Sequence, residues 1–298
     1  MIVAVAPEFL PRIQRDEPMS RHTSWHVGGP ADVFFTPADR AELASFVRAL
    51  PAGTPIHWIG LGSNLLVRDG GLRGVVISTH GALDALRRID ETTVSCEAGV
   101  ACARIARHCI KWGLGPAEFF AGIPGTLGGA LAMNAGAFGG ETWRHVVEVE
   151  TLDRAGTVLT RRADEYRVSY RHVEAPARDE WFLSARLTFE HKPGANDAEV
   201  RALLAKRKAS QPIGEWSCGS VFTNPPGDHA ARLIEAAGLK GFRIGDASVS
   251  AKHANFIINH GEATAADLER LIGQVQATIE QRTGIRLVPE VRIVGEAR

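Results

Sequence analysis

The sequence predicts an α+β protein assembled from three parts. Short apolar runs of strand length, such as 56–59, occur among helical periodicities, of which 264–283 is the longest. A chain of 298 residues is too long for one ordinary hydrophobic core, so we expect two or three domains. Hydrophobic residues make up 45% of the chain and charged residues 23%, which is typical of a globular protein.

The first part begins after an N-terminal arm, residues 1–20, in which three prolines disfavour regular structure. Apolar residues at helical spacing then predict a helix, for which Thr36 is a plausible N-cap. Two apolar runs, 56–59 and 75–78, are expected to be buried strands, and the first of them ends in a glycine turn. Residues 21–82 are therefore expected to form a small α/β domain.

The second and third parts have their own sets of elements. In residues 83–192 we expect a strand at 94–98, a helix at 101–111 and strands at 146–152, 158–161 and 182–189. A linker around 191–194 follows. In residues 196–298 we expect helices at 197–208, 230–237 and 264–283 and strands at 256–259 and 287–294. The helix at 230–237 would end at Gly238, which suits a C-terminal cap.

Charge and hydropathy exclude several classes of partner. Basic and acidic residues number 34 each, so the formal net charge is zero and there is no basic excess to attract nucleic acid or a membrane surface. No segment approaches the roughly 20 apolar residues that span a bilayer, and the N-terminus lacks the pattern of a secretion signal. We therefore expect a cytoplasmic protein that binds anions through local groups.

The four cysteines predict no metal site. Cys96, Cys102, Cys109 and Cys218 form no C-x-x-C pair, and no histidine cluster lies near them at metal-ligand spacing. In a chain of this size, buried free thiols are the expectation, which fits a reducing compartment.

A glycine turn follows the run at 56–59. Its candidate cofactor contacts are Gly60, Gly62, Ser63, Asn64 and Leu65. Glycine lets the backbone approach a pyrophosphate, and successive N–H groups can bind an anion. The turn is not a Rossmann fingerprint, because position 65 is leucine where a third glycine is needed. Taken alone, an ordinary turn at the end of a strand is at least as good an interpretation.

A second glycine-rich segment spans 122–129 and continues into small residues at 130–137, which have the composition of a helix pressed against a ligand or a sheet. Its candidate cofactor contacts are Gly122, Pro124, Gly125, Thr126, Gly128, Gly129, Asn134, Gly136 and Ala137. No Lys-Ser or Lys-Thr follows the last glycine of 122–129, so the segment is not a Walker A loop. Packing alone would tolerate alanine, so this many glycines favours main-chain contact with a polar cofactor.

A third such segment, 23–31, lies near the start of the chain. Trp25 within it is kept among the candidate cofactor contacts, although a tryptophan there is more often a core residue. Three glycine turns without a Rossmann or Walker continuation point to a dinucleotide held mainly by backbone amides. FAD, bound non-covalently, is the natural candidate.

The ordered set of motifs resembles the UDP-N-acetylenolpyruvoylglucosamine reductase family, and the resemblance runs from about residue 23 to residue 292. The most specific stretches are 60–66, 122–136, 170–172, 218–225, 237–245, 249–259 and 289–292. The resemblance implies an FAD-binding half of two subdomains, of the vanillyl-alcohol-oxidase (PCMH) type, plus a C-terminal α+β substrate-binding domain. It also implies NADPH-dependent reduction of UDP-N-acetylglucosamine enolpyruvate to UDP-N-acetylmuramate for peptidoglycan synthesis.

The resemblance also implies roles for individual residues. The implied catalytic residues are Arg171, Ser220 and Glu290, and the implied substrate-binding residues are Tyr170, Lys208, Asn224 and His253, with Asn255 in the same run. The spacer between His172 and Trp181 is short, which is typical of the branch without an inserted tyrosine loop. Thr223 stands where a lysine is common in the family, which puts one electrostatic contact to the substrate in doubt.

The implied reaction adds a hydride to the β carbon of an enol ether, and negative charge develops on the adjoining carboxylate. Arg171 can hold that carboxylate with two parallel hydrogen bonds. Glu290 suits a protonated donor or an orienting group, and Ser220 would protonate the α carbon. Lys208, Arg171 or the turn at Gly219 could stabilise the serine alkoxide, and the sequence does not choose among them. NADPH and substrate are expected to use one flavin face in turn.

Two other functions fit parts of the pattern. An alcohol or hydroxy-acid oxidase of the same fold would have no use for Lys208 and Asn224. A non-catalytic nucleotide-sugar binding protein would not need Arg171, Ser220 and Glu290 together. We expect a monomer.

Overall fold

The computed structural model describes residues 5–298, which form two compact units. Unit 1 comprises the chain up to Arg15, Val33–Leu61 and Gly74–Ala205, and unit 2 comprises Asp16–Asp32, Gly62–Arg73 and Lys206–Arg298. This division is discontinuous, whereas the parts expected from the sequence are contiguous. The boundaries at 21–82, 83–192 and 196–298 remain predictions.

The N-terminal third contains η1 (Pro7–Arg12), β1 (Ile13–Pro18), η2 (Met19–Arg21), β2 (Pro30–Phe35), α1 (Arg40–Ala49), β3 (Ile56–Ile59), β4 (Leu65–Val67) and β5 (Leu72–Ser78). One sheet has the strand order β1-β2-β5-β3. In unit 1, β3 pairs in parallel with β5, and α1 packs its apolar side against them. Phe35 and Phe46 stack there with ring centroids 3.8 Å apart.

Two expectations for this region are wrong. The arm is not irregular, because β1 is an edge strand of the sheet, where Pro18 is tolerated as its last residue; the arm's residues 1–4 lie outside the described residues. The cap of α1 is Asp39 rather than Thr36, because the Asp39 carboxylate accepts a hydrogen bond from the Glu42 N–H at 2.9 Å.

The middle of the chain contains β6 (Leu86–Arg88), β7 (Thr93–Glu97), α2 (Cys102–Lys111), β8 (Leu114–Gly115), η3 (Glu118–Gly122), α3 (Leu127–Met133), β9 (Gly136–Ala137), β10 (Gly140–Glu141), η4 (Thr142–His145), β11 (Val146–Asp153), β12 (Val158–Arg162), η5 (Ala163–Glu165), β13 (Arg167–Ser169), β14 (His172–Glu174), β15 (Glu180–Thr188) and β16 (Glu190–His191). An antiparallel sheet has the order β12-β11-β15-β7-β6.

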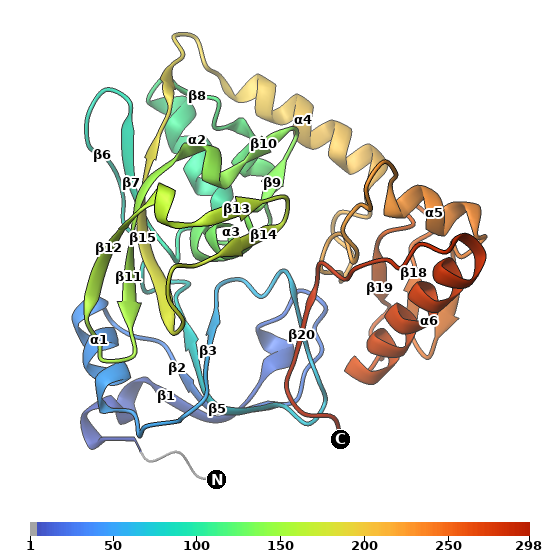
Figure 1. Ribbon diagram of the computed structural model, residues 1–298, viewed down its shortest axis with the longest axis horizontal. Coiled ribbons are helices and arrows are strands. Elements are labelled where there is room, and N and C mark those ends of the chain that lie inside the picture. Colours follow the sequence, from blue (N-terminus) through green and yellow to red (C-terminus); the bar gives the residue numbers. More distant parts are fainter. Residues whose placement is uncertain (1–4) are drawn as a thin grey trace. The chain divides into compact units, whose positions relative to one another are not determined.

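Helices α2 and α3 cover one face of this sheet (Figure 1). Alternate residues of β7, such as Val94 and Cys96, point into the core, which is the pattern of a strand with one covered face. The helix α3 starts earlier than expected and stops at Asn134, whose φ of 47° lies in the left-handed region. Asparagine accepts that conformation and ends the helix.

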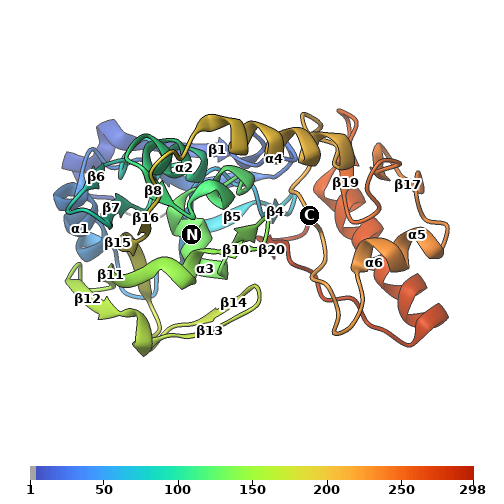
Figure 2. The ribbon, with the colours of Figure 1, turned by 90° about the horizontal axis from the view of Figure 1, so that it is seen from above.

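The C-terminal third contains α4 (Asp197–Ser210), α5 (Ala230–Ala236), β17 (Arg243–Ile244), β18 (Ala247–Val249), β19 (Ile257–Asn259), α6 (Ala265–Thr283) and β20 (Arg292–Val294). In unit 2, α5 and α6 pack on the small antiparallel sheet β17-β18-β19 (Figures 1 and 2). The final strand is shorter than the expected 287–294. No helix among residues 5–298 is long and apolar enough to cross a membrane.

The start of α6 anchors the β4–β5 connection in unit 2. Thr264 and Asp267 form a reciprocal capping box at the first turn. The carboxylate of Asp69 also accepts hydrogen bonds from the N–H groups of Ala265 and Ala266, each at 3.0 Å. Two otherwise unsatisfied helix amides are thereby paired with a residue almost 200 positions earlier in the chain.

Asp69→Ala should therefore lower the stability of the protein by about 1–2 kcal/mol, because it removes a charged acceptor from a helix N-terminus. Urea titration followed by circular dichroism measures this change. Asp164→Ala is the matched control, since Asp164 forms an exposed ion pair with Arg162 and its loss should be nearly neutral. Equal effects of the two substitutions would contradict the anchoring role of Asp69.

Candidate active site

The glycine-rich loop before α3 is fixed by main-chain hydrogen bonds inside unit 1. The carbonyl of Gly125 accepts from the Cys102 N–H at 2.9 Å. The N–H groups of Leu127 and Gly128 donate to the carbonyls of Val100 and Ala98 at 2.9 and 2.8 Å. These two amides at the start of α3 are therefore used by the protein itself.

Three glycines of the two unit 1 segments are required by packing. A Cβ added at Gly60 would lie 2.3 Å from Thr126 Oγ1, and one added at Gly122 would lie 2.6 Å from Ala137 Cβ. At Gly136 it would lie 2.3 Å from a backbone oxygen. Packing alone would not tolerate alanine at these positions, so the argument that their number favours a cofactor is wrong for them. What they show is that the segments at 60 and at 126 lie in contact.

Gly129, in the first turn of α3, is an exception. It is exposed, and a Cβ added there would come no nearer than 4.0 Å to Thr126 Oγ1. Pro124 is also exposed, while Gly125 and Gly128 are half-buried. Pro124 and Gly129 are therefore open to a ligand, unlike the buried side chain of Thr126.

Asn134 links the end of α3 to the β13–β14 hairpin. Its side-chain Nδ2 donates to the carbonyl of Ser169 at 3.1 Å and to Glu141 Oε2 at 3.2 Å, and its Oδ1 accepts from the Trp143 N–H at 3.1 Å. The side chain is 2% exposed. Its polar atoms therefore hold the fold together, which favours a structural role for this candidate cofactor contact.

The hairpin carries Tyr170 and Arg171 in its two-residue turn, where Ser169 pairs with His172. The Arg171 guanidinium donates to the carbonyl of Asn134 at 3.2 Å and to that of Gly136 at 2.9 Å. Its φ of 56° is in the left-handed region, and such strain concentrates at functional sites. Tyr170 is 50% exposed and lies under the guanidinium, 5.4 Å from ring centre to Cζ.

In unit 2 the turn at Gly62 packs against the segment 22–24. A Cβ at Gly62 would lie 1.8 Å from the carbonyl oxygen of His22, and the Ser24 N–H donates to the Gly62 carbonyl at 3.2 Å. The buried Ser24 Oγ meets no hydrogen-bond partner among the described residues. An orphaned hydroxyl beside a glycine turn fits a ligand that supplies the missing partner.

Trp25 belongs to the core of unit 2. Its side chain is fully buried, and its indole N–H donates to the carbonyl of Ile257 at 2.8 Å. The structure therefore supports the core interpretation of its side chain over a flavin contact.

The turn at 60–65 is hydrogen-bonded to the segment that carries Glu290. Asn64 Nδ2 donates to the Glu290 carbonyl and the Arg292 N–H donates to the Asn64 carbonyl, both at 3.1 Å. Leu65 pairs in parallel with Arg292 in the β20–β4 ladder. Of the candidate contacts in this turn, Asn64 and Leu65 thus order the Glu290 segment, and Ser63 is half-buried beside them.

Ser220 and Glu290 are brought together in unit 2. The Glu290 N–H donates to the carbonyl of Val221 at 2.8 Å, and the Thr223 N–H donates to that of Val288 at 2.9 Å. On the other side, Asn255 bonds to Val221 and to Phe222. Arg171, the third implied catalytic residue, belongs to unit 1.

The carboxylate of Glu290 also acts on a neighbouring thiol. Burial, followed by the negative charge of Glu290, raises the pKa of Cys218 well above its ordinary value. Cys96, Cys102 and Cys109 are likewise buried free thiols whose pKa values burial raises, that of Cys109 to about 12. None of the four has the exposed, low-pKa environment of a reactive cysteine.

Of the implied substrate-binding residues of unit 2, Lys208 lies near the end of α4, and Asn224 and His253 lie in loops. The Lys208 carbonyl accepts from Lys252 Nζ, which places α4 beside the turn that carries His253. Burial, and then the charge of Lys240, lowers the pKa of His253, so its imidazole is neutral at pH 7. Asn224 is exposed, and its Oδ1 accepts from the Ala230 N–H at the start of α5, at 3.1 Å.

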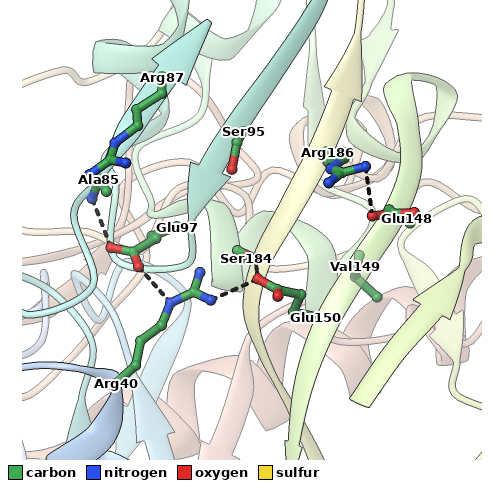
Figure 3. A pocket seen from close by; sticks show the side chains of 10 residues that line it. All are labelled: Arg40, Ala85, Arg87, Ser95, Glu97, Glu148, Val149, Glu150, Ser184 and Arg186. Atoms are coloured by element: carbon green, nitrogen blue, oxygen red, sulfur yellow. Dashed lines mark hydrogen bonds and ion pairs between the residues drawn. The ribbon is translucent and has the colours of Figure 1, made fainter. Parts of the chain in front are cut away.

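A separate polar hollow of about 330 Å³ lies on the five-stranded sheet of unit 1 (Figure 3). In it Arg40 binds Glu97 at 2.6 Å and Glu150 at 2.7 Å. Burial would raise the pKa of Glu150, but hydrogen bonds from Ser184 and Arg40 outweigh it and lower that pKa. Its central charges are paired with one another and it contains none of the candidate residues, so we interpret it as a structural network.

No group of three or more His, Cys, Asp or Glu side chains within residues 5–298 could hold a metal ion.

Two family models match the chain. A model of an FAD binding domain matches residues 31–161, and a model of the C-terminal domain of UDP-N-acetylenolpyruvoylglucosamine reductase matches residues 211–294. These matches confirm the expected fold class, an FAD-binding half followed by a C-terminal α+β domain.

Relatives of known name match almost the whole chain. The UDP-N-acetylenolpyruvoylglucosamine reductase of Alkalilimnicola ehrlichii is 62% identical over 285 residues, covering 95% of this chain and 94% of that protein. That of Methylococcus capsulatus is 54% identical over 283 residues, covering 95% and 93%. The crystal structure of UDP-N-acetylenolpyruvylglucosamine reductase from Thermus caldophilus is 30% identical, with a TM-score of 0.79 over 98% of this chain and 99% of that chain.

Alanine substitutions at two glycines should have opposite effects on stability. Gly62→Ala should destabilise the protein by about 2 kcal/mol or more, because its Cβ meets backbone and its φ is +60°. Gly129→Ala should be neutral or stabilising by roughly 0.5–1 kcal/mol, because it lies inside α3 with open space beside it. Thermal melts of the flavin-free proteins make the comparison. Equal melting temperatures would contradict the packing account.

Proposed function

We propose that this chain, which belongs to the UDP-N-acetylenolpyruvoylglucosamine reductase family, uses NADPH to reduce the enolpyruvyl double bond of UDP-N-acetylglucosamine enolpyruvate. The chain is an FAD-dependent oxidoreductase. The observation that carries the proposal is the high identity with reductases of that name over nearly the full length. The product would be UDP-N-acetylmuramate, a peptidoglycan precursor.

The open groups of the glycine segments fit a bound dinucleotide. The exposed face of Gly129 leaves room for main-chain approach, and the unpaired Ser24 Oγ has a hydrogen bond to give. We assign FAD contacts to these two residues and to the turns at Gly60–Leu65 and Gly122–Gly129, with the intervening glycines needed for packing. When bound, FAD supplies the hydride that NADPH donates.

Arg171 is the proposed partner of the substrate carboxylate. Two of its N–H groups are held by the carbonyls of Asn134 and Gly136, which fixes the plane of the guanidinium. A guanidinium fixed in this way can meet charge that develops on a carboxylate without reorganising. Tyr170, exposed beneath it, is the proposed wall of the same subsite.

Ser220 is the proposed proton donor to the α carbon, with Glu290 beside it. A serine hydroxyl is a weak acid and needs neighbours that stabilise its conjugate base. The pairing of the Glu290 and Val221 main chains supports a shared site for the two residues. Glu290 would act as a protonated donor or would orient the water that returns the proton to Ser220.

Lys208, Asn224 and His253 are the proposed contacts to the UDP-sugar. The exposure of Lys208 and Asn224 leaves their side chains open to an anionic nucleotide. A neutral His253 can donate and accept hydrogen bonds without repelling Lys208. Thr223, whose hydroxyl donates to the Val288 carbonyl at 3.2 Å, offers no charge where a lysine would, so Lys208 would carry the electrostatic contact.

We further propose a cytoplasmic monomer in which NADPH and the UDP-sugar use the flavin in turn. Initial rates measured at several concentrations of both should then give parallel double-reciprocal lines. Intersecting lines would contradict the alternating use of one site.

The direct test of the function is anaerobic titration of the purified flavoprotein. NADPH should bleach the flavin, and UDP-N-acetylglucosamine enolpyruvate should restore its colour with one equivalent of product. A flavin that NADPH reduces but this substrate does not reoxidise would contradict the proposal, and an alcohol-driven bleaching would favour an oxidase.

Ser220→Ala should slow reoxidation of the reduced flavin by the substrate by about 10²–10⁴-fold while leaving its reduction by NADPH unchanged, because only the second step needs the α proton. Stopped-flow absorbance separates the two half-reactions. Ser217→Ala, three residues earlier and outside the candidate set, is the control and should match the wild type. A wild-type reoxidation rate in Ser220→Ala would remove Ser220 from the mechanism.

A further inference from the structure

Asn255, in the 249–259 motif, forms hydrogen bonds to Val221 and Phe222, which directly follow Ser220. We propose that Asn255 is a positioning residue for proton delivery, which holds the Val221–Phe222 backbone so that Ser220 and Glu290 keep a fixed separation. The inference rests on the proposed function and deepens it, since it assigns Asn255 to the protein's own backbone rather than to the nucleotide.

The side-chain amide of Asn255 forms two hydrogen bonds with the backbone of one residue, Phe222, one as acceptor and one as donor. Its Oδ1 accepts from the Phe222 N–H at 3.0 Å, and its Nδ2 donates to the Phe222 carbonyl at 2.8 Å. Only this orientation of the amide satisfies both partners, so the geometry fixes which atom is oxygen. Its main-chain carbonyl adds a third bond, from the Val221 N–H at 2.9 Å.

Val221 joins this contact to the carboxylate segment. Its N–H is held by Asn255, and its carbonyl is held by the Glu290 N–H at 2.8 Å. Ser220 directly precedes Val221, so any slip of this residue moves the serine relative to Glu290. The backbone of the proton donor is thus fixed from both sides by named groups.

Water cannot replace the side-chain contact. Asn255 is 4% exposed and Phe222 is 2% exposed, so a lost partner leaves a buried polar group unsatisfied. The Val221–Phe222 backbone would have to shift to recover a hydrogen bond. A displacement on the order of 1 Å at a reacting group costs about 10²-fold in rate.

Asn259 provides a matched comparison within unit 2. It is also 4% exposed, its Nδ2 donates to the Trp25 carbonyl at 2.8 Å, and its Oδ1 accepts from Gly261 and Ala263. It therefore supports buried main chain in the same way, but at Trp25, Gly261 and Ala263 rather than at Val221 and Phe222.

The experiment compares Asn255→Asp with Asn259→Asp and the wild type, each as the FAD-loaded full chain. Each substitution is isosteric and replaces an amide donor by an oxygen that faces a carbonyl. Anaerobic stopped-flow measures the reduction of bound flavin by NADPH and its reoxidation by UDP-N-acetylglucosamine enolpyruvate, in H₂O and in D₂O, per mole of flavin. If Asn255→Asp does not retain FAD, the same rates and isotope effects are measured for Asn255→Ser in its place.

Asn255→Asp should reduce flavin at the wild-type rate and reoxidise it about 10²-fold more slowly, with a larger solvent isotope effect because proton transfer becomes slower. Asn259→Asp should keep the wild-type isotope effect and both wild-type rates per flavin. A purely structural role would lower stability but would not change the isotope effect in one half-reaction alone.

Equal slowing of both half-reactions in Asn255→Asp, or equal isotope effects in the two Asp variants, would overturn the role of Asn255. Neither result would contradict the proposed function, provided that the wild-type enzyme reduces the substrate. A wild-type enzyme whose reduced flavin is not reoxidised by this substrate would overturn the proposed function and this inference together.

Discussion

The main chain of Val221 is the constraint on which the proposed chemistry of unit 2 depends. Its carbonyl accepts a hydrogen bond from the N–H of Glu290, and its N–H donates to the carbonyl of Asn255. Ser220 directly precedes Val221, so this residue links a serine and a carboxylate that lie about 70 positions apart in the sequence. A hydroxyl is a poor acid, and its usefulness depends on fixed neighbours more than on its own pKa. The core of unit 2 therefore supports the backbone of the proposed proton donor.

The glycine segments serve two purposes that the sequence does not separate. At Gly62 and Gly136 the absent side chain lets one stretch of backbone pack directly on another, and at Gly60 it makes room for the Thr126 side chain. At Gly129 nothing fills the space. The first three glycines let the segments pack in contact, and Gly129 leaves the open space to which we assign the dinucleotide. The carbonyl of Gly136 is also one of the two acceptors that hold the Arg171 guanidinium, with that of Asn134.

Much of the fold was predictable because its periodic patterns are local. The strand at 56–59, the helix at 101–111 and the buried stripe of 264–283 depend on patterns that lie within one element, and all three are found close to their predicted bounds. The N-terminal strand was missed, because its partner strand supplies the hydrogen bonds that overrule the prolines. The final strand was predicted too long, because Pro289 interrupts the ladder and residues 288–290 bond to 221–223 instead.

The candidate site was only partly predictable for a similar reason. The resemblance named Ser220 and Glu290, and the structure places them together. The roles of Asn134 and Asn255 could not be predicted from the sequence, since residue type alone does not distinguish an asparagine in a buried hydrogen-bond network from one that binds a ligand. Their partners, Trp143 and Phe222, are identified only by tertiary contacts.

The configuration of the product made in D₂O tests the fixed proton donor most directly. If Ser220 delivers the proton from a backbone held on both sides, nuclear magnetic resonance of the UDP-N-acetylmuramate should show one solvent deuterium at the α carbon, in a single configuration. Deuterium in both configurations would mean that free water protonates the carbon, and would contradict the account.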